Sequence, residues 1–115
     1  MKLFSVFVLA LFLSGQGCAK PDSPKLKITE YFSPQCESCV AMEPVLNEIL
    51  SEFKGAVILE KINLDTVEGA SAGRALGIKE IPVLIFTDRE GREYFRHEGK
   101  LAPEIMRAII KDRIQ

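Results

Sequence analysis

The sequence predicts an α/β domain with a four-stranded mixed sheet and helices on both of its faces. Short apolar runs of strand length alternate with segments whose apolar residues recur at helical spacing. Between residues 26 and 114 the order is strand, helix, strand, helix, strand, strand, helix. The length of 115 residues and the hydrophobic fraction of 47% suit one small globular domain, which can bury a core without disulfide staples.

The first three predicted elements form a strand–helix–strand unit. The apolar run 26–32 predicts a strand, and residues 40–53 predict a helix. One face of that helix is apolar and is expected to pack on the core, with Met42, Val45, Leu46, Ile49, Leu50 and Phe53. Gly55 ends the helix, and the run 56–62, which is continuously apolar from Ala56 to Leu59, predicts a strand covered on both faces. Such a unit has a right-handed crossover.

A weaker helix is predicted next, over residues 66–76. Asp65 or Thr66 has the side chain to cap its first turn. Gly69 and Gly73 interrupt the pattern, because glycine disfavours a helix interior. The pattern therefore does not fix the residues at which this helix begins and ends.

The last three elements are a hairpin and a helix. Residues 82–86 predict a strand, residues 88–91 a turn and residues 92–98 an alternating partner strand. Residues 101–114 predict a helix with Pro103 in its first turn. The helix is expected to face the sheet with three isoleucines, Ile105, Ile109 and Ile110.

The most informative motif is Cys36-Glu37-Ser38-Cys39, which falls between the first strand and the first helix. Thiol–disulfide exchange needs one thiolate that attacks a foreign sulfur and a second thiol close enough to resolve the mixed disulfide. Three residues at the start of a helix provide that proximity. We expect Cys36 to attack and Cys39 to resolve.

The helix start also predicts the electrostatics of the pair. Free backbone N–H groups and the helix dipole lower the pKa of a first-turn thiol from its ordinary value of about 8.5, which favours Cys36 as the thiolate. Glu37 opposes this effect, because a carboxylate beside Cys36 disfavours the thiolate and so stabilises the reduced dithiol less. The balance favours a reductant over a strong oxidant.

A structural disulfide and half of a zinc site are the alternatives for the two cysteines. A closed zinc site needs four ligands, yet the chain offers only Cys18 and His97 besides the pair. His97 lies in the alternating stretch, where a solvent-facing strand position is expected. We therefore predict no metal and no cofactor.

The N-terminus has the features of an export signal, predicted over residues 1–17. Lys2 precedes an apolar block of eleven residues, 3–13, in which Ser5 is the one polar residue, and small residues follow. Eleven residues are too few to span a bilayer core of about 30 Å, which takes about 20. Residues 18–25 are expected to form a spacer, and residues 26–115 the domain. The predicted location is the periplasm or the outer face of the cell membrane.

Cys18 directly follows this segment, in an arrangement that resembles a bacterial lipoprotein signal. We expect Cys18 to carry lipid and to anchor the protein to a membrane. Gly15 stands where such signals usually have leucine, and ordinary cleavage that removes Cys18 is the alternative. Either outcome leaves a single cysteine pair in the mature domain.

A net charge of −1 without a basic patch predicts no nucleic-acid partner, and we expect a monomer.

Nearly the whole mature chain resembles the thioredoxin family. Beyond the two cysteines, Pro44 lies five residues after Cys39, where the family has a proline in its active-site helix. Residues 61–65 (KINLD) and 77–82 (GIKEIP) resemble two further family segments, and Gly99 matches a glycine near the active-site surface. The resemblance implies a minimal thioredoxin fold, with four strands because the family's opening strand and helix have no counterpart here.

The resemblance also implies two features of the site. The Ile81–Pro82 peptide bond is expected to be cis and to place the Ile81 backbone where a substrate's extended chain can pair with it. Glu30 aligns with the family's buried acid and Lys61 with its partner. Glu30 would accept the proton that Cys39 loses. A purely structural ion pair between Glu30 and Lys61 is the alternative.

These observations predict an exported protein-disulfide reductase. Its partners would be protein disulfide substrates and a membrane electron donor that no residue identifies. A disulfide oxidase or isomerase of the same fold, a Cu(I)-binding metallochaperone, and a scaffold with incidental cysteines remain as alternatives. Residues 32–35 and Glu37-Ser38 depart from the family's usual sequence, which leaves substrate preference open.

Overall fold

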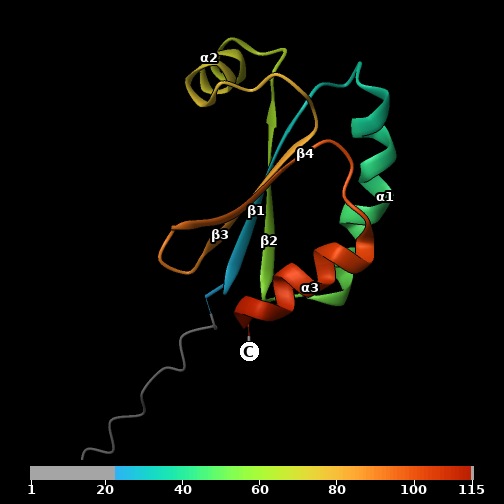
Figure 1. Ribbon diagram of the computed structural model, residues 1–115, viewed down its shortest axis with the longest axis vertical. Coiled ribbons are helices and arrows are strands. Elements are labelled where there is room, and N and C mark those ends of the chain that lie inside the picture. The colour runs from blue at the N-terminus through green and yellow to red at the C-terminus, as the bar shows by residue number, and fades with distance from the viewer. Residues whose placement is uncertain (1–22, 115) are drawn as a thin grey trace, which may run out of the picture.

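The computed structural model describes residues 23–114, which form seven regular elements around one sheet (Figure 1). Their order matches the predicted one. The elements are β1 (Leu26–Phe32), α1 (Glu37–Glu52), β2 (Val57–Asn63), α2 (Val67–Leu76), β3 (Val83–Asp88), β4 (Glu93–Glu98) and α3 (Pro103–Ile114).

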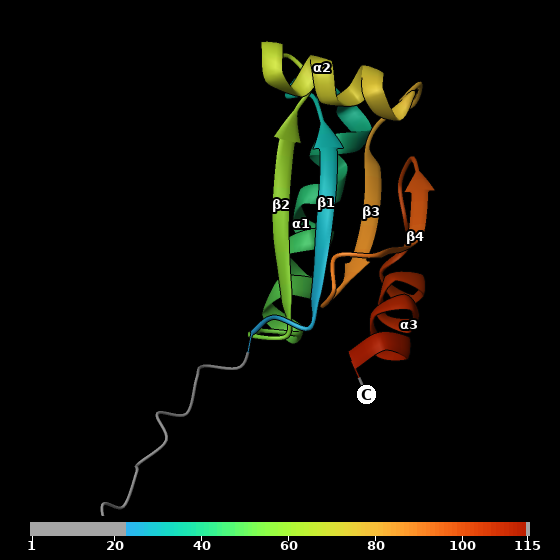
Figure 2. The same ribbon diagram turned by 90° about the vertical axis from the view of Figure 1, so that its left-hand side faces the viewer.

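The sheet has the strand order β2-β1-β3-β4 and is mixed, as predicted. β1 runs parallel to β2 and antiparallel to β3, and β4 is antiparallel to β3. Figures 1 and 2 show α1 and α3 on one face of the sheet. α2 lies across the other face, at the end of the sheet where β1 ends. The prediction of helices on both faces is therefore confirmed.

Two apolar clusters hold these layers together. The larger one joins β1 and β3 to α1 and α3, and includes Leu26, Ile28, Met42, Leu46, Ile49, Leu84, Phe86, Met106 and Ile110. The smaller one lies on the opposite face, where Tyr31, Val83 and Ile85 contact residues of α2 and its flanking loops. Because side chains alternate along a strand, Ile28 and Glu30 face the α1 layer while Tyr31 faces α2.

The helix α2 is continuous, and its two glycines have a packing role. A Cβ atom on Gly69 would collide with the backbone carbonyl of Asn63, and one on Gly73 would lie 2.7 Å from a methyl carbon of Leu64. The glycines therefore let α2 sit directly on the preceding loop. Thr66 is the N-cap, and its hydroxyl accepts the Gly69 N–H at 3.0 Å, which resolves the choice between the two predicted caps.

The expected coverage of the second strand on both faces is wrong for β2. This strand is at the edge of the sheet, and Ile58 has 45% of its surface exposed. α2 covers only the end of the strand near Ile62, so Ile58 and Glu60 on the same face lie beyond its reach. Continuous apolar character reflects both faces of a strand but does not report its position in the sheet.

The expected inward face of the last helix is also wrong at one position. Ile105 has 52% of its surface exposed, whereas Met106 is fully buried. The inward stripe of α3 is Met106, Ile109 and Ile110, a spacing of three and four residues that matches one helical face.

Candidate redox site

Cys36 lies where the chain passes from the end of β1 into α1. The connecting turn is held by Ser33, whose carbonyl accepts the Cys36 N–H at 3.1 Å and whose hydroxyl donates to Asp65 at 2.9 Å. Cys36 is the N-cap of α1, and its sulfur accepts the backbone N–H of Cys39 at 3.1 Å. The predicted strand, tight loop and helix opening at Cys36 is thus present.

Cys36 and Cys39 form a disulfide across the first turn of α1, with Cα atoms 5.2 Å apart. Their environments differ. Cys39 is buried, with 2% of its surface exposed, while Cys36 is half-buried. An outside sulfur can therefore approach Cys36 directly, whereas Cys39 is shielded behind it. This asymmetry suits the expected roles of an attacking and a resolving thiol.

A backbone segment from the other half of the chain lies beside the disulfide. The Ile81–Pro82 peptide bond is cis, as the resemblance implied. The Ile81 carbonyl oxygen is 3.8 Å from the Cys36 sulfur and accepts a hydrogen bond from the Ser38 hydroxyl at 3.2 Å. The Gly99 N–H donates to the Pro82 carbonyl at 2.7 Å, which ties the segment after β4 to this loop.

A shallow concavity adjoins Ser38, between the start of α1 and the segment after β4. Its lining residues are Glu37, Ser38, Ala41 and Lys100. It places one acidic and one basic side chain beside Ser38, whose hydroxyl is 3.3 Å from the sulfur of the half-buried Cys36.

Glu30 is fully buried on β1, on the face that packs against α1. Neither of its carboxylate oxygens has a hydrogen-bond partner among the described residues. Burial raises the pKa of Glu30; the charge of Lys61 partly counters this, and the charge of Glu43 adds to it. A buried carboxylate whose pKa is raised is a better proton acceptor than a solvated one.

The Lys61 ammonium lies closer to Glu43 than to Glu30. Its Nζ atom is 3.9 Å from a Glu30 oxygen but 3.1 Å from Glu43, and it lies 4.4 Å from the centre of the Phe32 ring. The expected Glu30–Lys61 pair exists, yet the tighter contact of Lys61 is with Glu43 on α1. Sequence reasoning missed Glu43, because nothing in a separation of 18 residues indicates that its carboxylate meets this lysine.

His97 is the other candidate ligand among the described residues. The His97 ring is half-buried on β4 rather than fully solvent-facing, and its Nε2 atom is 3.0 Å from the Lys100 carbonyl. Among residues 23–114, no group of three or more histidine, cysteine, aspartate or glutamate side chains could hold a metal ion.

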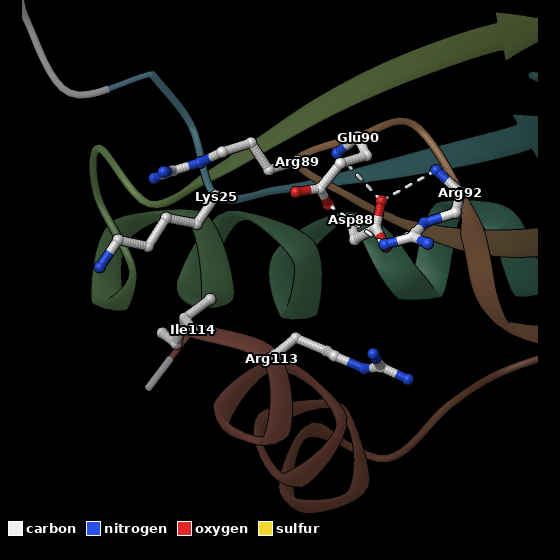
Figure 3. Close-up of a pocket in the computed structure, with 7 residues that line it drawn as sticks. All are labelled: Lys25, Asp88, Arg89, Glu90, Arg92, Arg113 and Ile114. Carbon is white, nitrogen blue, oxygen red and sulfur yellow. Dashed lines mark hydrogen bonds and ion pairs between the residues drawn. The ribbon is translucent and has the colours of Figure 1, made fainter.

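A second polar concavity lies at the opposite end of the sheet, around the β3–β4 turn (Figure 3). It is lined by Lys25, Asp88, Arg89, Glu90, Arg92, Arg113 and Ile114. Asp88 accepts the backbone N–H groups of Glu90 and Arg92, and the latter bond in particular lowers the pKa of this aspartate. These contacts explain the tight turn, and none of the seven residues that line the concavity is a cysteine.

Comparison with known proteins places the chain in a family. The profile of the thioredoxin family matches residues 19–112. Thioredoxin 2 of Chlorobaculum tepidum is 24% identical over 93 residues, which cover 81% of this chain and 75% of that protein. Thioredoxin of Thiocapsa roseopersicina is 33% identical over 60 residues, or 52% of this chain and 64% of the relative.

Solved structures agree on the fold. Thioredoxin-2 of the malaria parasite, described as a component of the parasite's protein secretion machinery, superimposes with a TM-score of 0.70 at 19% identity, over 76% of this chain and 82% of that one. The chain therefore belongs to the thioredoxin family. Its Cys36–Cys39 pair is consistent with a thiol–disulfide oxidoreductase.

The predictions for the N-terminus lie outside the described residues. These are the signal at 1–17, the lipid on Cys18 and most of the spacer 18–25. Within residues 23–114, no helix has the length and apolar character needed to cross a bilayer.

Proposed function

We propose that this protein is an exported thioredoxin-like reductase of protein disulfides. The observation that carries the proposal is the asymmetric pair at the start of α1, where Cys36 is reachable and Cys39 is buried behind it. The Ile81 carbonyl, 3.8 Å from the Cys36 sulfur, supports a protein substrate, because it offers a backbone acceptor to an extended chain.

The first step is attack by the Cys36 thiolate on a substrate disulfide. A bond forms between the Cys36 sulfur and one substrate sulfur, and the other substrate sulfur leaves as a thiolate. The N–H of Cys39, which points at the Cys36 sulfur, stabilises the thiolate before attack. The reachable position of Cys36 makes it the attacking group.

The second step releases the substrate. Cys39 loses its proton and attacks the Cys36 sulfur, which forms the intramolecular disulfide and expels the second substrate thiolate. Glu30 is the proposed proton acceptor, since it is buried in the same layer between β1 and α1 and has a raised pKa. Overall, two electrons pass from the cysteine pair to the substrate, and a dithiol donor must return them.

The N-terminal features support the exported location. The segment 1–17 has the pattern of an export signal, and Cys18 is the proposed lipid attachment point. Figures 1 and 2 show the described chain beginning at the end of the sheet opposite the start of α1. An anchor on that side would leave the cysteine pair facing away from the membrane, towards soluble substrates, and the donor would be a membrane electron carrier.

Trapping tests the proposal. A Cys39→Ser variant keeps the attacking thiol but cannot release the substrate, so mixed disulfides should accumulate in the native host. A Cys36→Ser/Cys39→Ser variant is the matched control and should retain none. Recovery of exported proteins by the first variant alone is the expected result. Absence of mixed disulfides, together with wild-type protein that is fully oxidised in the cell, would overturn the reductase assignment.

A disulfide oxidase is the second candidate, and one contact favours it. The Cys39 N–H bond to the Cys36 sulfur stabilises a thiolate, and a stabilised reduced form makes a stronger oxidant. Equilibration of the Cys36–Cys39 pair with glutathione buffers separates the two functions. A potential well below about −200 mV is expected, and a value well above it would favour the oxidase.

A further inference from the structure

The Ser38 hydroxyl lies between the reactive sulfur and the neighbouring backbone. Its oxygen is 3.3 Å from the Cys36 sulfur and 3.2 Å from the Ile81 carbonyl oxygen. The sulfur and the carbonyl oxygen are themselves 3.8 Å apart. The three atoms form a compact triangle in which only the serine hydroxyl can rotate freely to change its partner.

A hydroxyl carries one proton, so Ser38 can donate to only one of its two neighbours at a time. In the disulfide state the Cys36 sulfur is an uncharged, weak acceptor that already receives the Cys39 N–H. The Ile81 carbonyl is the better acceptor, and its geometry with Ser38 meets the criteria of a hydrogen bond. Donation to Ile81 is therefore favoured in the oxidised protein.

Reduction changes the order of the two acceptors. When the disulfide opens, Cys36 can become a thiolate, and hydrogen bonds to ionised acceptors are about twice as strong as those between neutral groups. The Ser38 oxygen is already within reach of the sulfur, so rotation of the hydroxyl proton is enough to change partner. That rotation also releases the Ile81 carbonyl for a substrate N–H.

We propose that Ser38 is a redox-dependent positioning residue, whose hydroxyl donates to Ile81 in the disulfide form and to the Cys36 thiolate in the reduced form. The inference rests on the proposed thiol–disulfide exchange at the same site. Because its hydrogen bond to the Cys36 thiolate is stronger than its bond to the neutral Ile81 carbonyl, Ser38 stabilises the reduced form more than the disulfide form. It therefore raises the reduction potential of the pair and partly offsets the opposing effect expected of Glu37. Ser38 is also a position at which this chain departs from the usual family sequence.

Other charged groups near Cys36 also influence its ionisation. Glu37 is on the same helix, Lys100 lines the adjoining concavity, and Lys79 and Glu80 directly precede Ile81. A Ser38→Ala substitution leaves all four in place. A difference between Ser38→Ala and the wild type therefore reports the hydroxyl alone.

The test is a titration of the reduced protein, followed by ultraviolet absorbance of the thiolate. The acid dissociation constant of Cys36 should fall about tenfold in Ser38→Ala, as expected for loss of one charge-assisted hydrogen bond in a partly solvated site. The same tenfold change lowers the reduction potential by about 30 mV. Ser38→Thr, which keeps a hydroxyl, should restore both values, and Ser51→Ala, on the exposed side of α1, should change neither.

Two distinct failures are possible. An unchanged dissociation constant or an unchanged potential in Ser38→Ala would overturn the role of Ser38 while leaving the exchange reaction intact. If the wild-type pair cannot be reduced and reoxidised reversibly by a small dithiol, the proposed function itself fails. Both readouts are independent of knowing the physiological substrate.

Discussion

Replacing the buried acid Glu30 by leucine should make the protein more stable. The glutamate side chain is fully buried, and neither carboxylate oxygen has a hydrogen-bond partner among the described residues. Leucine has a similar volume to glutamate, and residue 30 of β1 faces the α1 layer, as Ile28 does. The substitution therefore removes an unsatisfied polar group and introduces an apolar one where the core already lies.

The size of the effect follows from two opposing contributions. An unsatisfied buried polar group costs about 1–3 kcal/mol. Against this, the charge of Lys61 attracts Glu30 across 3.9 Å and would be lost. Lys61 is not left without a partner, because it contacts Glu43 at 3.1 Å and a third of its side chain remains exposed. We therefore expect a net stabilisation of about 1–2 kcal/mol near neutral pH.

The stabilisation should also depend on pH in a defined direction. The pKa of Glu30 in the folded protein is raised above 4.5 by burial. The folded state thus binds the proton more tightly than the unfolded chain, so this group's contribution to stability is fully present below pH 4.5 and declines as the pH rises through the folded pKa. Glu30→Leu lacks this decline, so the difference in free energy of unfolding between the variant and the wild type should grow with pH.

Urea unfolding of both proteins, oxidised and at several pH values, measures this difference. The other carboxylates are common to the two chains, so their titration cancels when the free energies are subtracted. A Glu30→Leu protein that is less stable than the wild type at neutral pH would refute the reasoning, as would an advantage that shrinks with rising pH. Either result would mean that Glu30 is well solvated or hydrogen-bonded in the folded state.

Three smaller predictions concern the scaffold. Thr66→Ala removes the cap of α2 and should lower the free energy of unfolding by about 1 kcal/mol in urea titrations. Gly69→Ala forces a Cβ atom against the Asn63 carbonyl and should cost roughly 1–3 kcal/mol, whereas Ser71→Ala on the exposed side of the same helix should be nearly neutral. Arg107→Ala breaks the ion pairs that join α3 to two glutamates of α1. The urea midpoint of this variant should therefore lie below that of the wild type at low salt, and the difference should shrink in about 1 M salt, which screens the pairs.

The elements were predictable from the sequence because each carries its own periodicity. The stripe from Met42 to Ile49 identifies α1 without any knowledge of its partners. Periodicity does not give the position of an element in the sheet or against its neighbours. Ile58 is apolar on a strand, but it is exposed because β2 is an edge strand and α2 is too far along the sheet to cover it. Ile105 is similar, since a shift of one residue moves the inward stripe to Met106.

The candidate site divides in the same way. Cys36 and Cys39 are local in sequence, so their spacing alone predicts a shared helical turn. The contacts of Ser38 with Ile81 and of Lys61 with Glu43 join segments 43 and 18 residues apart. Only the resemblance to a family placed the Ile81–Pro82 segment near the cysteines. No pattern in the sequence indicated the contacts of Ser38 or of Glu43.

The buried Glu30 is the residue at which the sequence departs most from what the fold alone requires. An apolar residue at this central strand position would complete the larger cluster, and most buried polar groups in proteins find a partner. Retaining a buried acid that has no hydrogen-bond partner among the described residues is costly for stability, so its presence needs a compensating role. If proton transfer from Cys39 is that role, Glu30→Leu should be both the more stable protein and the slower to release a mixed disulfide. A variant that gains stability and releases substrate at the wild-type rate would show that proton transfer from Cys39 is not the role of Glu30.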